Sequence, residues 1–210
     1  MRKIQFANEE HYHIFNRGVD KREIFSGGED IVRFLQSMDE FNSIDPIGSI
    51  YENSLKLGDL VSKRKSKPKL VDFVCYCLNP NHYHFILRQR EEKGIEKFMH
   101  RIGVGYTMFF NKKHKRSGSL FQGTFKAVHI STNEQLLHTS AYVNLNDRVH
   151  RLGDLVSKSS WGEYEKGVKG FCEKDVILGQ FNNIKEYKDF AESSLADILE
   201  RRDMEKLLLE

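Results

Sequence analysis

The chain has 210 residues, of which 39% are hydrophobic and 11% aromatic, and its formal net charge is +3. This apolar content excludes a disordered chain, and no apolar run approaches the roughly 20 residues that a membrane-spanning helix needs. The amino-terminal residues contain no apolar signal-peptide segment. We therefore expect a folded cytoplasmic protein with no membrane partner.

The chain contains three cysteines, Cys75, Cys77 and Cys172. The single residue between the first two fits neither a zinc site nor a redox motif. We expect all three to be buried, passive thiols.

The small net charge hides an uneven distribution along the chain. Residues 62–130 contain 15 Lys and Arg against four Asp and Glu, whereas residues 171–210 contain six against ten. A basic middle segment suits a polyanionic partner such as nucleic acid. A solvated basic surface without a partner would have the same composition, so charge alone does not decide.

The first half of the chain predicts a strand, a helix and a β-hairpin. Residues 11–16 are aromatic-rich and strand-like, and apolar residues recur at helical spacing over 30–41. Residues 45–69 contain Pro, Gly and a lysine-rich run, which we interpret as an insertion. The apolar segments 70–78 and 82–88 are joined by an Asn-Pro-Asn turn and predict two antiparallel strands.

The second half predicts a helix over 94–113, a strand over 125–130, and a helix that begins at Thr132 or Asn133 and runs to Asn146. This order of elements matches the ferredoxin-like, split βαβ topology. We predict an α+β fold over residues 1–150, with an antiparallel sheet and helices on one of its faces. Residues 151–210 are expected to form a loop and a C-terminal helical tail.

The sharpest local feature is the pair His82 and His84. Residues two apart on a strand point to the same face, so both imidazoles can bind one divalent ion. Two strand histidines can also be ordinary polar surface.

A second pair lies on the predicted helix after the sheet. Tyr142 and Asn146 are four residues apart and would be neighbours on one helix face. They could place a phenol nucleophile beside a metal ligand. Alternatively, Tyr142 is a core aromatic and Asn146 a helix-end cap.

Taken together, these features resemble a known family, the single-tyrosine HUH transposases, which include the REP-associated tyrosine transposases. The resemblance runs through four blocks in chain order, at residues 11–18, 76–87, 106–127 and 141–146. The second block contains the name-giving His-hydrophobic-His motif. Each block is moderately specific, and all four in order are highly specific.

The resemblance implies roles for individual residues. The metal ligands map onto His82, His84 and Asn146, the cofactor being Mg²⁺ or Mn²⁺, and the nucleophile maps onto Tyr142. The implied enzyme is a transposase that cleaves and rejoins single-stranded DNA at hairpin-associated sites through a 5′-phosphotyrosine intermediate. The family includes monomers and homodimers, so either state remains open here.

Several polar and basic residues near these blocks are candidate contacts for DNA, although each could be plain surface. They are Asn16, Arg17, Lys112, Lys113, Lys115, Arg116, Gln122 and Lys126. Two other functions stay open. One is a domesticated relative that binds hairpin DNA without transposition. The other is an RNA-binding ferredoxin-like module, which would need exposed sheet aromatics in a pattern that we do not find.

Overall fold

The structure is a computed structural model that describes residues 4–50, 68–153 and 156–207. Most of the predicted insertion at 45–69 lies outside the described residues. The strands are β1 (His11–Arg17), β2 (Val71–Asn79), β3 (His82–Gln89), β4 (Lys126–Ile130) and β5 (Lys158–Ser159). The helices are α1 (Gly28–Glu40), α3 (Gly94–Lys113), α4 (Asn133–Asn144), α5 (Asn146–Val149), α6 (Trp161–Lys166), α7 (Asp175–Leu178) and α8 (Ile184–Leu207), with a 3-10 turn, η1, at Val19–Lys21.

The five strands form one antiparallel sheet in the order β4-β1-β3-β2-β5. The first four have the order of a ferredoxin-like sheet, which confirms the predicted fold class. The fifth strand was not predicted, because two residues are too few to show a periodic pattern. It pairs Lys158 and Ser159 with the end of β2 and extends the sheet at that edge.

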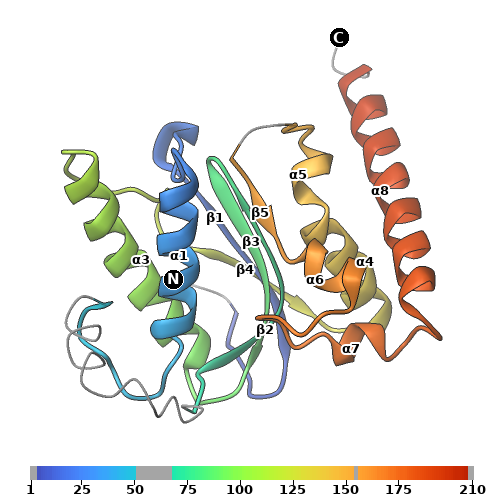
Figure 1. Ribbon diagram of the computed structural model, residues 1–210, viewed down its shortest axis with the longest axis horizontal. Helices are drawn as coiled ribbons and strands as arrows, with labels where there is room; N and C mark the ends of the chain where they lie inside the picture. The colour runs from blue at the N-terminus through green and yellow to red at the C-terminus, as the bar shows by residue number, and fades with distance from the viewer. Residues whose placement is uncertain (1–3, 51–67, 154–155, 208–210) are drawn as a thin grey trace.

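Helices cover both faces of the sheet (Figure 1). The two helices between the ferredoxin-like strands, α1 and α3, lie on one face, as predicted. Helices α4 and α5, which also fall within residues 1–150, lie on the other face with α6 to α8, so the prediction of helices on a single face was wrong for them. Strand alternation supplies a separate hydrophobic cluster to each face. None of the helices in the described ranges is long and apolar enough to cross a membrane. Cys75, Cys77 and Cys172 are free and buried, as predicted.

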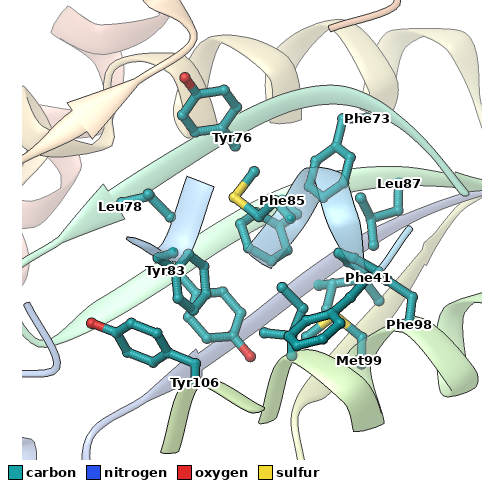
Figure 2. Close-up of a cluster of buried hydrophobic side chains, with 14 of the residues drawn as sticks. Phe41, Phe73, Tyr76, Leu78, Tyr83, Phe85, Leu87, Phe98, Met99 and Tyr106 are labelled. Atoms are coloured by element: carbon teal, nitrogen blue, oxygen red, sulfur yellow. The ribbon is translucent and has the colours of Figure 1, made fainter. Parts of the chain in front are cut away.

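Aromatic side chains dominate the core between the sheet and helices α1 and α3 (Figure 2). Phe34 of α1 packs edge-on against Tyr106 of α3, with ring centroids 4.7 Å apart. The ring of Phe41 packs directly against the backbone of α3 at Gly105. A Cβ at Gly105 would lie 2.6 Å from that ring. The helix over 94–113 therefore tolerates its glycine because packing requires the space there.

The helix predicted to run to Asn146 ends two residues earlier. Leu145 has φ −108° and ψ 19°, and Asn146 begins the separate helix α5. Asn144 and Asn146 are both fully buried. Residues two apart on a continuous helix point about 200° away from each other. Asn144 reaches Ser160 and Tyr187, whereas Asn146 reaches His82.

The charged tail predicted after residue 150 packs on the sheet domain through α8. The hydroxyl of Tyr187, which is fully buried, lies 3.2 Å from Oγ of Ser140 and accepts a hydrogen bond from Nδ2 of Asn144 at 2.9 Å. At the surface, Arg148 pairs with Glu192 at 2.6 Å. Helix α8 thus covers the outer side of α4 and fixes its position.

We predict that Tyr187→Phe destabilises the protein by about 1–3 kcal/mol, because Nδ2 of Asn144 would be left buried without an acceptor. The same substitution at Tyr142 is a matched control. The Tyr142 hydroxyl makes no hydrogen bond to the described residues, so its loss should change stability by less than about 0.5 kcal/mol. Chemical denaturation of the two variants measures the difference, and equal stabilities would contradict the assigned role of Tyr187.

Candidate active site

The two histidines of the His-hydrophobic-His motif face α4. In the pairing of β1 with β3, Arg17 lies opposite His82, and Phe15 lies opposite His84. Residues directly opposite in an antiparallel pair share a face. Together they form part of a pocket of about 380 Å³. Its lining residues are Phe15, Asn16, Arg17, Lys21, Asn81, His82, His84, Gln122, Lys126, Tyr142 and His150.

A neighbouring amide sets the tautomer of His82. Nδ2 of Asn81 donates to the carbonyl of Lys21 at 3.2 Å, so its Oδ1 faces His82 and accepts from Nδ1–H at 2.6 Å. Nε2 of His82 therefore carries a lone pair. Burial lowers the pKa of His82, which favours the neutral, ligating form.

The second histidine is oriented by a residue of β1. Nδ1 of His84 lies 2.9 Å from Nε2 of His13, and the two rings are stacked. Burial lowers the pKa of His13 to about 4 and that of His84 well below its usual value. Both rings are therefore neutral near pH 7. Because Nδ1 of His84 is engaged in the hydrogen bond with His13, its Nε2 is left to bind a ligand.

Asn146 completes this cluster with an oxygen. Its Oδ1 lies 3.1 Å from Nε2 of His82, and its Nδ2 is buried without a hydrogen-bond partner among the described residues. Such an orphan costs roughly 1–3 kcal/mol. In the described part of the chain no three His, Cys, Asp or Glu side chains group to hold a metal. Two imidazole nitrogens and an amide oxygen fit a divalent cation such as Mn²⁺.

Tyr142 lies in the same pocket. Its ring meets those of His84 and His13 edge-on, with centroids 5.5 Å and 6.0 Å away. The side chain is partly exposed, and its hydroxyl makes no hydrogen bond to the residues that the structure describes. Although the break at Leu145 separates Tyr142 from Asn146, both side chains still reach the histidine pair. The hydroxyl is thus accessible beside the candidate ligands.

Four of the predicted DNA contacts line this pocket. Asn16 donates to the carbonyl of Gly123 at 3.2 Å, and Nε of Arg17 donates to Oε1 of Gln122. Lys126 is exposed at the pocket wall. These side chains place positive charge and amide groups beside the histidines.

The other four predicted contacts lie outside the pocket, at the end of α3 and in the loop that follows. They are Lys112, Lys113, Lys115 and Arg116. Lys113 pairs with the fully buried Asp30 at 2.8 Å, and Arg116 donates to Asn111 and to the carbonyl of Ser119. The end of α3 and the β2–β3 turn lie toward the same end of the molecule (Figure 1). DNA contact by Lys112 and Lys115 stays a prediction, whereas the internal contacts of Lys113 and Arg116 make a DNA contact less favourable for these two.

Sequence reasoning missed several residues of the pocket and its surroundings. The two-residue period of β1 puts His13 and Phe15 on one face of that strand, which the sequence does indicate. The pairing with β3 puts this face beside His84. Asn79 and Asn81 belong to the predicted turn and carried no separate signal. The ring centroids of His150 and His82 are 4.7 Å apart. These residues are distant in sequence, so the fold, and no local pattern, brings them together.

Comparisons with known proteins bear on the family and the fold. Residues 54–146 match the family model described as transposase IS200 like. A solved REP-associated tyrosine transposase bound to a REP hairpin has a similar fold, with a TM-score of 0.51, 9% identity, and coverage of 81% of this chain and 88% of that one. The resemblance expected from the sequence is thereby confirmed.

Two further comparisons add nothing to the assignment. The tRNA(His) guanylyltransferase of Saccharomyces cerevisiae aligns over 95% of this chain and 80% of its own, at 13% identity. Its TM-score of 0.36 is too low to carry an argument. A comparison with curated proteins found no match.

We predict that acid destabilises the protein between about pH 6.5 and about pH 4. Unfolded histidine titrates near pH 6.5, whereas folded His13 titrates at about 4. The unfolded chain therefore binds more protons in this window, and each such histidine lowers the free energy of unfolding by up to about 1.4 kcal/mol per pH unit.

Denaturant unfolding in a metal chelator, between about pH 7 and about pH 5, measures this slope. His13→Phe keeps an aromatic ring and should flatten the slope. Parallel slopes in His13→Phe and the wild type would show that His13 is not a source of the pH dependence.

Proposed function

We propose that this chain, a relative of IS200-like transposases over residues 54–146, is a transposase that cleaves and rejoins single-stranded DNA beside hairpins. One observation carries the proposal. Tyr142 and the candidate ligands His82, His84 and Asn146 converge on one face of the sheet, although they come from two distant parts of the chain.

Tyr142 would act as the nucleophile. Its phenol oxygen attacks the scissile phosphorus, the bond from phosphorus to the 3′ oxygen breaks, and a 5′-phosphotyrosine and a free 3′-OH result. The phenol proton passes to solvent, and the leaving oxygen takes up a proton from solvent. The covalent link retains the bond energy, so that a later 3′-OH can rejoin the strand.

His82, His84 and Asn146 would hold Mg²⁺ or Mn²⁺. When bound, the cation would neutralise charge on the scissile phosphate and make phosphorus more electrophilic. The chain prepares this site by itself. Asn81 and His13 each bond one ring nitrogen of a ligating histidine, which fixes the orientation of the ring.

The pocket wall suits a single DNA strand. Arg17 and Lys126 are exposed there and can contact phosphates, and the ring of Phe15 offers a surface for a base. The similar solved transposase is bound to a REP hairpin, which supports a hairpin as the substrate here. Tyr142 and the histidines belong to one chain, so a monomer contains every group that the reaction needs.

The same surface would serve a relative that binds hairpins without cleaving them, and activity must decide between the two. The RNA-binding alternative is less favourable. Such modules stack bases on an open sheet surface, whereas α1 and α3 cover one face of this sheet and α4 to α8 cover much of the other.

We predict that Tyr142→Phe abolishes the covalent protein–DNA adduct and leaves hairpin binding within about twofold of the wild type, because only the nucleophilic oxygen is lost. A denaturing gel with labelled hairpin DNA and Mn²⁺ detects the adduct. Tyr76→Phe, on the opposite side of the sheet, is the control and should form it normally. An adduct in the Tyr142→Phe lane would refute the assignment, and none in the wild type would favour the non-cleaving relative.

We also predict that two lysines differ in their effect on DNA binding. Lys126→Ala should reduce the salt dependence of binding by roughly 0.7–1 in the log–log slope, because one phosphate contact is lost. Lys113→Ala should leave the slope unchanged and lower the melting temperature, since Lys113 pairs with buried Asp30. Titrations at several salt concentrations separate these outcomes. A reduced slope for Lys113→Ala would instead place the end of α3 against DNA.

A further inference from the structure

The amide of Asn79 lies against two candidate metal ligands. Asn79 is the last residue of β2, directly opposite His82 in the ladder, and is fully buried. Its Nδ2 lies 2.8 Å from Oδ1 of Asn146 and 3.0 Å from Nε2 of His82, and these two acceptors are 3.1 Å apart. The three atoms thus form a nearly equilateral triangle.

A triangle of this size matches one face of an octahedral coordination sphere. Adjacent ligands roughly 2.1 Å from a cation such as Mg²⁺ stand roughly 3.0 Å apart. Two corners of the triangle are already acceptors. The third is an amide nitrogen, which has hydrogens and no lone pair to offer. Rotation of the Asn79 amide about its Cβ–Cγ bond would exchange Nδ2 for Oδ1 at that corner.

Two contacts bear on this rotation. Among the described residues, Oδ1 of Asn79 accepts one weak hydrogen bond, from Sγ of Cys77 at 3.4 Å. The rotation also removes the contacts of Nδ2 with Asn146 and His82, and coordination of all three groups to the cation would replace them. Asn146 directs its oxygen to the same point, and its buried Nδ2 has no partner in the described part of the chain. An orphaned nitrogen with the oxygen turned inward is the arrangement expected around a cation.

We propose that Asn79 is a fourth metal ligand, beside His82, His84 and Asn146, and that its amide rotates to present Oδ1 to the cation. The inference rests on the proposed function, because that function supplies the divalent cation. The same side chain then has two uses. As a donor it holds the two acceptors together, and as an acceptor it completes the ligand set.

The test is Mn²⁺ binding by the full chain without DNA, measured by calorimetry and by the electron paramagnetic resonance of free Mn²⁺. Asn79→Ala should weaken binding by about tenfold or more, the range seen when metal-site groups are removed. Asn79→Asp, of nearly the same shape, should tighten binding by about tenfold, because a carboxylate adds charge to the ligand set. Thermal melting checks that each variant folds.

The alternative is that Asn79 only occupies the place of the cation. Asn79→Ala would then bind Mn²⁺ as tightly as the wild type or more tightly, and the proposal would be wrong. If Asn79→Ala does not fold, Asn79→Asp decides, and unchanged or weaker binding overturns the proposal.

His82→Ala separates this inference from the proposed function. Loss of binding in His82→Ala, with unchanged binding in both Asn79 variants, removes Asn79 from the ligand set and leaves the metal site intact. Equal binding by His82→Ala and the wild type would refute the metal site itself, and the role of Asn79 with it.

Discussion

The antiparallel pairing of β2 with β3 is the constraint on which the site depends. The turn between them sets Asn79 opposite His82 and Cys77 opposite His84, all on the face toward α4. Because side chains alternate along a strand, a slip of one residue would turn both histidines into the aromatic core beneath α1 and α3. The buried residues Tyr83 and Phe85 oppose that slip, since each would lose its place in the core. Packing of the core on one face of the sheet therefore determines which side chains point into the site on the other face.

Buried polar side chains also position the residues of the helices beside the sheet. Asn144 is held by Ser160 and Tyr187, and Asn146 lies against His82 and Asn79. The hydrogen bonds of Asn144 are internal and serve packing between α4, β5 and α8. Those of Asn146 leave its Nδ2 without a partner among the described residues. Satisfied networks are typical of structural positions, and the unsatisfied amide of Asn146 supports the metal site proposed above.

Sequence patterns predicted the elements whose signal is local. The strands and the helices over 30–41 and 94–113 follow from apolar periodicity, and the histidine pair follows from strand alternation. The end of α4 could not be predicted, because partners distant in sequence decide it. The basic middle segment was also ambiguous: Lys113 and Arg116 are used internally, and only the fold brings Asp30 to Lys113. For His13 and Phe15 the two-residue period predicts a shared face of β1, but only the pairing of β1 with β3 puts that face beside His84.

The position of α8 has a consequence for the order in which the molecule is built. During synthesis, α8 leaves the ribosome after all the other described elements, whereas the strands that carry the histidines are complete much earlier. Until α8 arrives, the hydroxyl of Ser140 and the amide of Asn144 lack the Tyr187 partner that joins them. The helix that bears Tyr142 is therefore the last part of the site to be fixed in place. A nascent chain would have a formed histidine cluster before its nucleophile is held firmly against it.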